Sequence, residues 1–85
     1  MYQIKFTKQA YKALRRLPSD VVRRIRDKLA QVAKDPYGQY KNVTKLQNRA
    51  GYRLRIGDWR VIYDVEDTAL VILVLKVGPR GDVYR

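Results

Sequence analysis

Apolar and polar residues alternate in the first segment of the chain. Residues 2–6 read YQIKF, and the apolar side chains Tyr2, Ile4 and Phe6 fall on every second position. A period of two is typical of a strand with one buried face. We therefore expect a β-strand over residues 2–6.

Two segments with helical spacing follow. Thr7 is a typical N-cap residue and predicts a helix that runs to about Leu17, where a proline follows. Ser19 or Asp20 would cap a second helix that ends at about Lys34. The apolar stripe of this second helix comprises Val21, Val22, Ile25, Leu29, Val32 and Ala33. Because the connection between the helices is very short, we expect an antiparallel helical hairpin.

Three strands are predicted in the second half of the chain, over about residues 51–56, 59–65 and 69–77. Gly57 and Asp58 would join the first two strands as a tight hairpin. The last segment, ALVILVLKV, is apolar on both faces, which indicates a central strand covered by helices on one side. No clear period is visible in the polar segment that precedes these strands.

The predicted order of elements is β-α-α-β-β-β. We expect one domain over residues 1–85, with an α+β fold in which the helical hairpin covers one face of a mostly antiparallel sheet. The last three strands would form a meander. The first strand would pair beside the central strand or at an edge.

The charge adds a functional expectation to this fold. The chain has 19 Lys and Arg residues against 8 Asp and Glu residues, a formal net charge of +11. Such an excess favours a nucleic-acid partner, bound through counterion release, or an acidic protein partner, over a merely soluble basic protein. An anionic membrane surface is a further alternative. No apolar run is long enough to span a bilayer and no signal peptide is recognisable, so we expect a cytoplasmic protein without membrane association.

The residue types exclude several classes of enzyme. The chain has no histidine and no cysteine, so it cannot form a Ser-His-Asp triad, a Cys-His pair or a histidine-based ribonuclease site. A zinc site would lack its usual ligands, and the glycines fit turns better than a phosphate-binding loop. We expect no metal and no cofactor.

Arginines concentrate on the predicted hairpin. Arg53 and Arg55 are two residues apart on a strand and therefore project from one face, and Arg60 would lie near Arg55 across the hairpin. Three like charges repel one another and are stabilised when an anion binds between them. The cluster indicates either a solvated sheet face or a phosphate site, and arginine forks suit the charged phosphate that forms when an RNA 2′-OH attacks its own phosphodiester.

Further basic and aromatic residues could extend such a site. Lys41, Lys45 and Arg49 keep the segment before the hairpin basic, and Arg85 does so in the tail, which makes all four candidate RNA-binding residues. Tyr84 could stack on a base or could cover an apolar edge of the fold.

Three segments together resemble a known family. They are FTKQAYKALRRLP, YRLRIGDWRVIYDV and VGPRGDVY, and with the predicted order of elements they are similar to the RelE/ParE toxin superfamily of bacterial and archaeal toxin–antitoxin systems. The resemblance implies a small basic endoribonuclease that cleaves mRNA in the ribosomal A site, beside 16S rRNA, without metal. It also implies a cognate antitoxin as partner, and operator DNA as a target of the antitoxin complex only.

The resemblance also implies roles for individual residues. Arg60 and Arg80 would hold the scissile phosphate, Tyr84 would stack on or orient the nucleotide, and Arg53 and Arg55 would bind phosphates. The best-understood RelE pattern has lysines at the positions of Arg53 and Arg55, and one of these lysines is a candidate general base. Arginine keeps its proton at neutral pH, which leaves Tyr84 or water for proton transfer. Two other functions stay open, a ParE-like inhibitor of DNA gyrase and a noncatalytic RNA- or ribosome-binding module.

Overall fold

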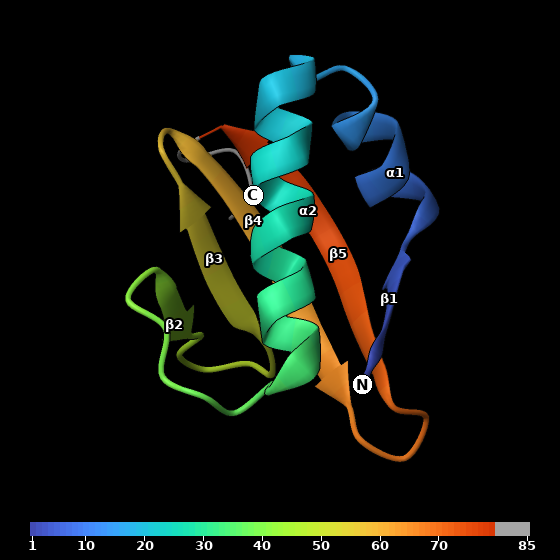
Figure 1. Cartoon of the computed structure of the whole chain (residues 1–85), viewed down its shortest axis with the longest axis vertical. Coiled ribbons are helices and arrows are strands. Elements are labelled where there is room, and N and C mark those ends of the chain that lie inside the picture. Colours follow the sequence, from blue (N-terminus) through green and yellow to red (C-terminus); the bar gives the residue numbers. More distant parts are fainter. Residues whose placement is uncertain (80–85) are drawn as a thin grey trace.

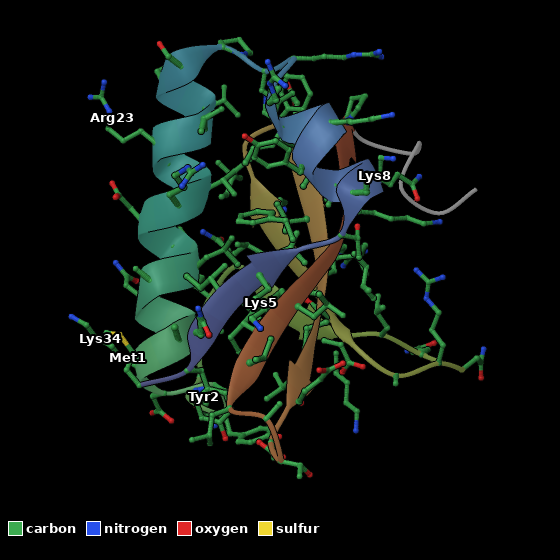
Figure 2. The ribbon with its side chains drawn as sticks, turned by 90° about the vertical axis from the view of Figure 1, so that its right-hand side faces the viewer. Met1, Tyr2, Lys5, Lys8, Arg23 and Lys34 are labelled. Carbon is green, nitrogen blue, oxygen red and sulfur yellow. The ribbon has the colours of Figure 1, made fainter. Side chains whose placement is uncertain are left out.

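The computed structural model describes residues 1–79, which form one sheet with two helices on one of its faces (Figure 1). In chain order the elements are β1 (Gln3–Phe6), α1 (Lys8–Leu14), α2 (Ser19–Lys34), β2 (Val43–Lys45), β3 (Tyr52–Ile56), β4 (Trp59–Glu66) and β5 (Val71–Pro79). Figure 2, turned by a right angle, shows α2 standing clear on one side of the sheet. The predicted α+β class and the placement of the helices on one face are confirmed.

The strands of the sheet lie in the order β1-β5-β4-β3-β2. Strands β2 to β5 form an antiparallel meander, and β1 pairs with β5 in parallel from Gln3 opposite Val71 to Phe6 opposite Val74. A parallel pair needs a long crossover, which the two helices and the meander supply between β1 and β5. The first strand therefore lies at an edge, and the apolar segment of β5 lies inside the sheet as predicted.

Strand β2 is an element that the sequence did not indicate. It has only three residues, too few to show a period, and it pairs with β3 from Val43 opposite Leu54 to Lys45 opposite Tyr52. Val43 packs against the core, whereas Thr44 and Lys45 are exposed. The strand thus brings a polar, basic segment to the edge of the sheet.

The predicted cap of the first helix is confirmed, but its predicted end is wrong. Thr7 Oγ1 accepts the backbone N–H of Ala10 at 3.1 Å and donates to the carbonyl of Leu75 at 3.1 Å, so it also ties α1 to β5. The helix ends at Leu14, because the N–H of Leu17 bonds the carbonyl only three residues back and tightens the chain into a turn.

The second helix ends at Lys34 as predicted, but neither Ser19 nor Asp20 caps it. Both residues lie inside its first turn, and Pro18 is the N-cap, without a side-chain hydrogen bond. The carbonyl of Pro18 accepts the N–H of Val22 instead. The helix therefore starts from a proline that presets the backbone dihedral φ.

The core lies between the helices and the sheet. Its fully buried side chains come from α2 and from the inner strands and include Ile25, Leu29, Leu54, Val61, Tyr63, Ile72 and Val74. The register between β4 and β5 shifts between Ile62 and Tyr63, as in a β-bulge. Among residues 1–79, no helix is both long and apolar enough to cross a membrane.

Candidate functional site

The arginines of the β3–β4 hairpin lie on the sheet face that the helices leave uncovered. On β3, Leu54 and Ile56 are 1% and 4% exposed and belong to the core, so the alternating Arg53 and Arg55 point away from the helices. Arg60 pairs with Arg55 directly across the hairpin. The predicted proximity of Arg55 and Arg60 is confirmed.

The side chain of Arg60 is held at the hairpin turn. Its Nη1 donates to the carbonyls of Gly57 and Trp59, both at 3.1 Å. Gly57 has a φ of +57°, a left-handed conformation that a tight hairpin needs and that glycine adopts without strain. The carbonyls of the turn thus fix the guanidinium of Arg60, the residue that pairs with Arg55.

Three paired residues lie side by side across β3, β4 and β5, next to the pair of Arg55 and Arg60. Arg53 lies opposite Ile62 on β4, and Ile62 lies opposite Lys76 on β5. Ile62 is 2% exposed although it lies outside the helix-side core, so this position between the two cations is not open to solvent. Lys76 is not among the residues expected from the sequence, where its signal is a single lysine inside an otherwise apolar strand.

Two of the predicted RNA-binding residues meet Arg53 in a hollow of about 320 Å³. Lys45 of β2 and Arg49 of the following loop line this hollow together with Arg53. The loop turns back sharply because Asn48 and Gly51 both have positive φ. A Cβ built on Gly51 would lie 2.9 Å from the carbonyl oxygen of Tyr63, so only glycine fits this approach.

A second, smaller hollow of about 150 Å³ adjoins the first. It is lined by Lys41, Asn42, Thr44, Arg53 and Arg55. The structure therefore brings all three basic residues of the segment before β3 into contact with the hollows that the β3 arginines line. Arg80, Tyr84 and Arg85 lie outside the described residues, so their contribution to the site stays a prediction.

A carboxylate at the other end of β4 accepts hydrogen bonds from two tyrosines. Asp67, in the turn between β4 and β5, accepts the hydroxyl of Tyr2 at 2.7 Å and that of Tyr37 at 2.6 Å. These bonds lower the pKa of Asp67, and the bond to the carboxylate raises the pKa of Tyr37 to about 12. Asp67 therefore acts as a structural link and does not neutralise the arginine face.

The arrangement suits the binding of an anion. Guanidinium groups from two strands can hold phosphate oxygens in a bidentate manner. Among residues 1–79, no three carboxylates come together in a group that could hold a metal ion. The charged side chains that line the two hollows, as far as the structure describes them, are all lysines and arginines.

Comparison with known proteins identifies the family. A family model described as "ParE toxin of type II toxin-antitoxin system, parDE" matches residues 4–84. The curated protein "mRNA interferase toxin RelE" of Escherichia coli K12 is 29% identical over 98% of this chain and 90% of its own length.

Solved structures of similar proteins have the same fold. The archaeal RelE of the RelE–RelB complex from Pyrococcus horikoshii OT3 is 39% identical, with a TM-score of 0.79 over 94% of this chain and 96% of that one. RelE in the intact E. coli RelBE toxin–antitoxin complex is 29% identical, with a TM-score of 0.81 over 93% and 96%. The chain therefore belongs to the RelE/ParE superfamily of toxins from type II toxin–antitoxin systems, and it is of the RelE type.

Proposed function

We propose that this toxin is an endoribonuclease that cleaves mRNA in the ribosomal A site, without metal, by attack of the RNA 2′-OH on the adjacent phosphate. The observation that carries the proposal is the placement of Arg60 directly opposite Arg55, with Arg53 two residues along on the same uncovered face. An RNA substrate supplies its own nucleophile, so the protein has to orient the phosphate and stabilise its charge.

Each arginine has a distinct task in this scheme. Arg60, oriented by the carbonyls of Gly57 and Trp59, stabilises the pentacoordinate phosphate, and Arg53 and Arg55 hold the flanking phosphates. On the basis of the family resemblance, Arg80 joins Arg60 at the scissile phosphate, and Tyr84 orients the nucleotide or transfers a proton. Lys41, Lys45 and Arg49 bind the RNA next to these groups.

The relatives support both the activity and the partner. A curated relative is named as an mRNA interferase, and two of the similar structures are complexes of RelE with RelB. We infer that this toxin acts in the cytoplasm, where the ribosomes are, and that a cognate antitoxin neutralises it. Operator DNA is then contacted only through the antitoxin complex.

Primer extension on mRNA after induction of the toxin tests the proposal. We expect cuts at codon-defined positions in translated messages. Arg60→Gln should reduce cleavage by roughly 10²-fold or more, as the loss of a group that stabilises transition-state charge does. Arg23→Gln removes the same charge from an exposed position of α2 and should leave cleavage nearly unchanged.

A gyrase-directed toxin is the second candidate, because the matching family model is described as a ParE toxin. Intact mRNA together with trapped gyrase–DNA complexes would replace the proposal with this function. Intact mRNA together with stable ribosome binding would instead indicate a noncatalytic module.

A further inference from the structure

Helix α2 carries a polar stripe beside its buried one. Arg24, Lys28 and Gln31 are spaced by four and three residues, so they lie on one side of the helix. All three line a hollow of about 320 Å³ between α2 and the end of β3. Asn42 and Arg55 line the same hollow from the side of the sheet.

The guanidinium of Arg24 reaches the hairpin that carries the candidate site. A Cβ built on Gly57 would lie 3.6 Å from Nη2 of Arg24, an ordinary van der Waals distance, so this guanidinium lies next to the turn. A cation that α2 contributes thus lies beside the turn whose carbonyl orients Arg60. Sequence spacing alone gives no reason to link Arg24 to this turn.

The hollow at α2 continues the two hollows of the candidate site. It shares Asn42 and Arg55 with the hollow of about 150 Å³, which in turn shares Thr44 and Arg53 with the hollow beside β2. We call the three together the edge trough. It runs from the uncovered sheet face across the β2–β3 edge to α2, on the side where Figure 1 shows β2 and β3 beside the helix.

The charge of the edge trough selects a polyanion. Arg24 and Lys28 add to the five cations that line the first two hollows, and Asp27 is the one carboxylate among the lining residues. Apart from Ile56 and Gly57, the side chains that line the α2 hollow are polar. Guanidinium, ammonium and amide groups of this kind suit phosphates and base edges.

We propose that the edge trough is a path for single-stranded RNA, in which Arg24 and Lys28 bind phosphates of nucleotides outside the cleavage site. The part of the path over Arg53 and Arg55 rests on the proposed function. The part along α2 can be tested by RNA binding alone, without cleavage. The RNA backbone then turns around the edge of the sheet from the uncovered face towards the helix.

Binding of a fluorescein-labelled 2′-O-methyl oligouridine, which cannot be cleaved, tests the proposal by fluorescence anisotropy over a range of NaCl concentrations. The test variant is Arg24→Gln with Lys28→Gln. The matched control is Arg23→Gln with Lys34→Gln, which removes the same charge from the same helix. Figure 2 labels Arg23 and Lys34, and both project from α2 away from the sheet.

We expect a localised loss of binding in the test variant. Each phosphate contact on a single strand contributes about 0.7 to the slope of log K against log salt, so losing two lowers the slope by about 1.4 and weakens binding roughly 25-fold at about 0.1 M salt. The control should keep the slope of the natural chain. Arg24→Lys with Lys28→Arg should restore binding, and circular dichroism checks that all variants keep the fold.

Equal binding by the test and control variants would overturn the edge trough as an RNA path. So would a test variant that binds RNA like the control but loses affinity for the purified antitoxin, because an acidic protein would then be the occupant. The proposed function is tested separately, by ribosome-dependent cleavage. If the natural chain makes no such cuts, but the test variant alone loses RNA binding, the edge trough is an RNA path in a protein that is not a nuclease.

Discussion

At the residue scale, Tyr63 shows how a polar atom is carried into the core. Its side chain is fully buried and its ring stacks on that of Tyr52 at 5.5 Å between centroids. The hydroxyl is buried without a hydrogen-bond partner among residues 1–79. Burial raises the pKa of Tyr63, because the charged form would lose its hydration.

We expect Tyr63→Phe to keep the fold and to raise the free energy of unfolding by about 1 kcal/mol at pH 7, because it removes an unsatisfied buried group. The folded pKa lies above the unfolded value of 10.0, so the natural chain should lose stability as the pH rises above 10, and the variant should lose less. Urea unfolding at neutral and alkaline pH measures both effects.

Tyr40→Phe is the control for this prediction. The hydroxyl of Tyr40 lies 3.0 Å from the carbonyl of Gln31 and 2.8 Å from that of Asp35, so its removal should lower stability by about 1 kcal/mol. Equal losses of stability in the two variants would show that the hydroxyl of Tyr63 has a hydrogen-bond partner.

At the element scale, one turn links three segments that are distant in sequence. Asp67 lies between β4 and β5 and accepts hydroxyls from Tyr2, which precedes β1, and from Tyr37, which lies between α2 and β2. The carboxylate thus fixes the ends of both edge regions of the sheet. No sequence motif marks this arrangement, because each partner is far from the others along the chain.

Asp67→Asn should lower the melting temperature at pH 7, because an amide nitrogen cannot accept the second hydroxyl. The folded pKa of Asp67 is lowered, so its stabilisation is present above the ordinary value of 3.8 and is lost as the pH falls through the lowered value. The difference between the variant and the natural chain should therefore shrink in acid.

Thermal unfolding followed by circular dichroism from acid to neutral pH checks this dependence. Asp58→Asn, in the other hairpin turn, removes the same charge and should show no comparable loss. A constant difference between Asp67→Asn and the natural chain across this range would show that the hydrogen-bonded carboxylate is not its source.

At the scale of the whole molecule, the net charge of +11 opposes the compact state, and much of it is concentrated along the edge trough. An anion that binds the folded chain should relieve this repulsion. We expect sulfate to raise the melting temperature more than chloride at equal ionic strength, because a divalent oxyanion can bridge neighbouring guanidinium groups.

Differential scanning fluorimetry measures this difference, and Arg55→Gln with Arg60→Gln separates specific binding from the general effect of sulfate on protein hydration. In the double variant, the part of the rise in melting temperature that comes from the general effect of sulfate should remain. The part that comes from specific binding should be lost. An undiminished sulfate effect in the double variant would show that these arginines do not bind the anion.

The fold could be predicted to the extent that local patterns control it. The alternation of Tyr2, Ile4 and Phe6 and the apolar stripe of α2 each bury one face, so element type follows from the period. The strand β2 could not be predicted, because a three-residue pairing depends on β3, a partner further along the chain. The end of α1 was placed three residues too late, because the local turn that tightens the chain after Leu14 leaves no period in the sequence. The cap at Thr7 was predictable because it is local.

The sequence by itself determined the composition of the site. The lack of histidine and cysteine can be read directly from the residues. The relative positions of Arg53, Arg55 and Arg60 also follow from the sequence, because a strand of period two and a tight hairpin place these three arginines without further information. Only the tertiary structure decided which other cations join them. Lys76 and Arg24 reach the site through the β4–β5 register and the packing of α2, and both depend on contacts between elements far apart in the chain.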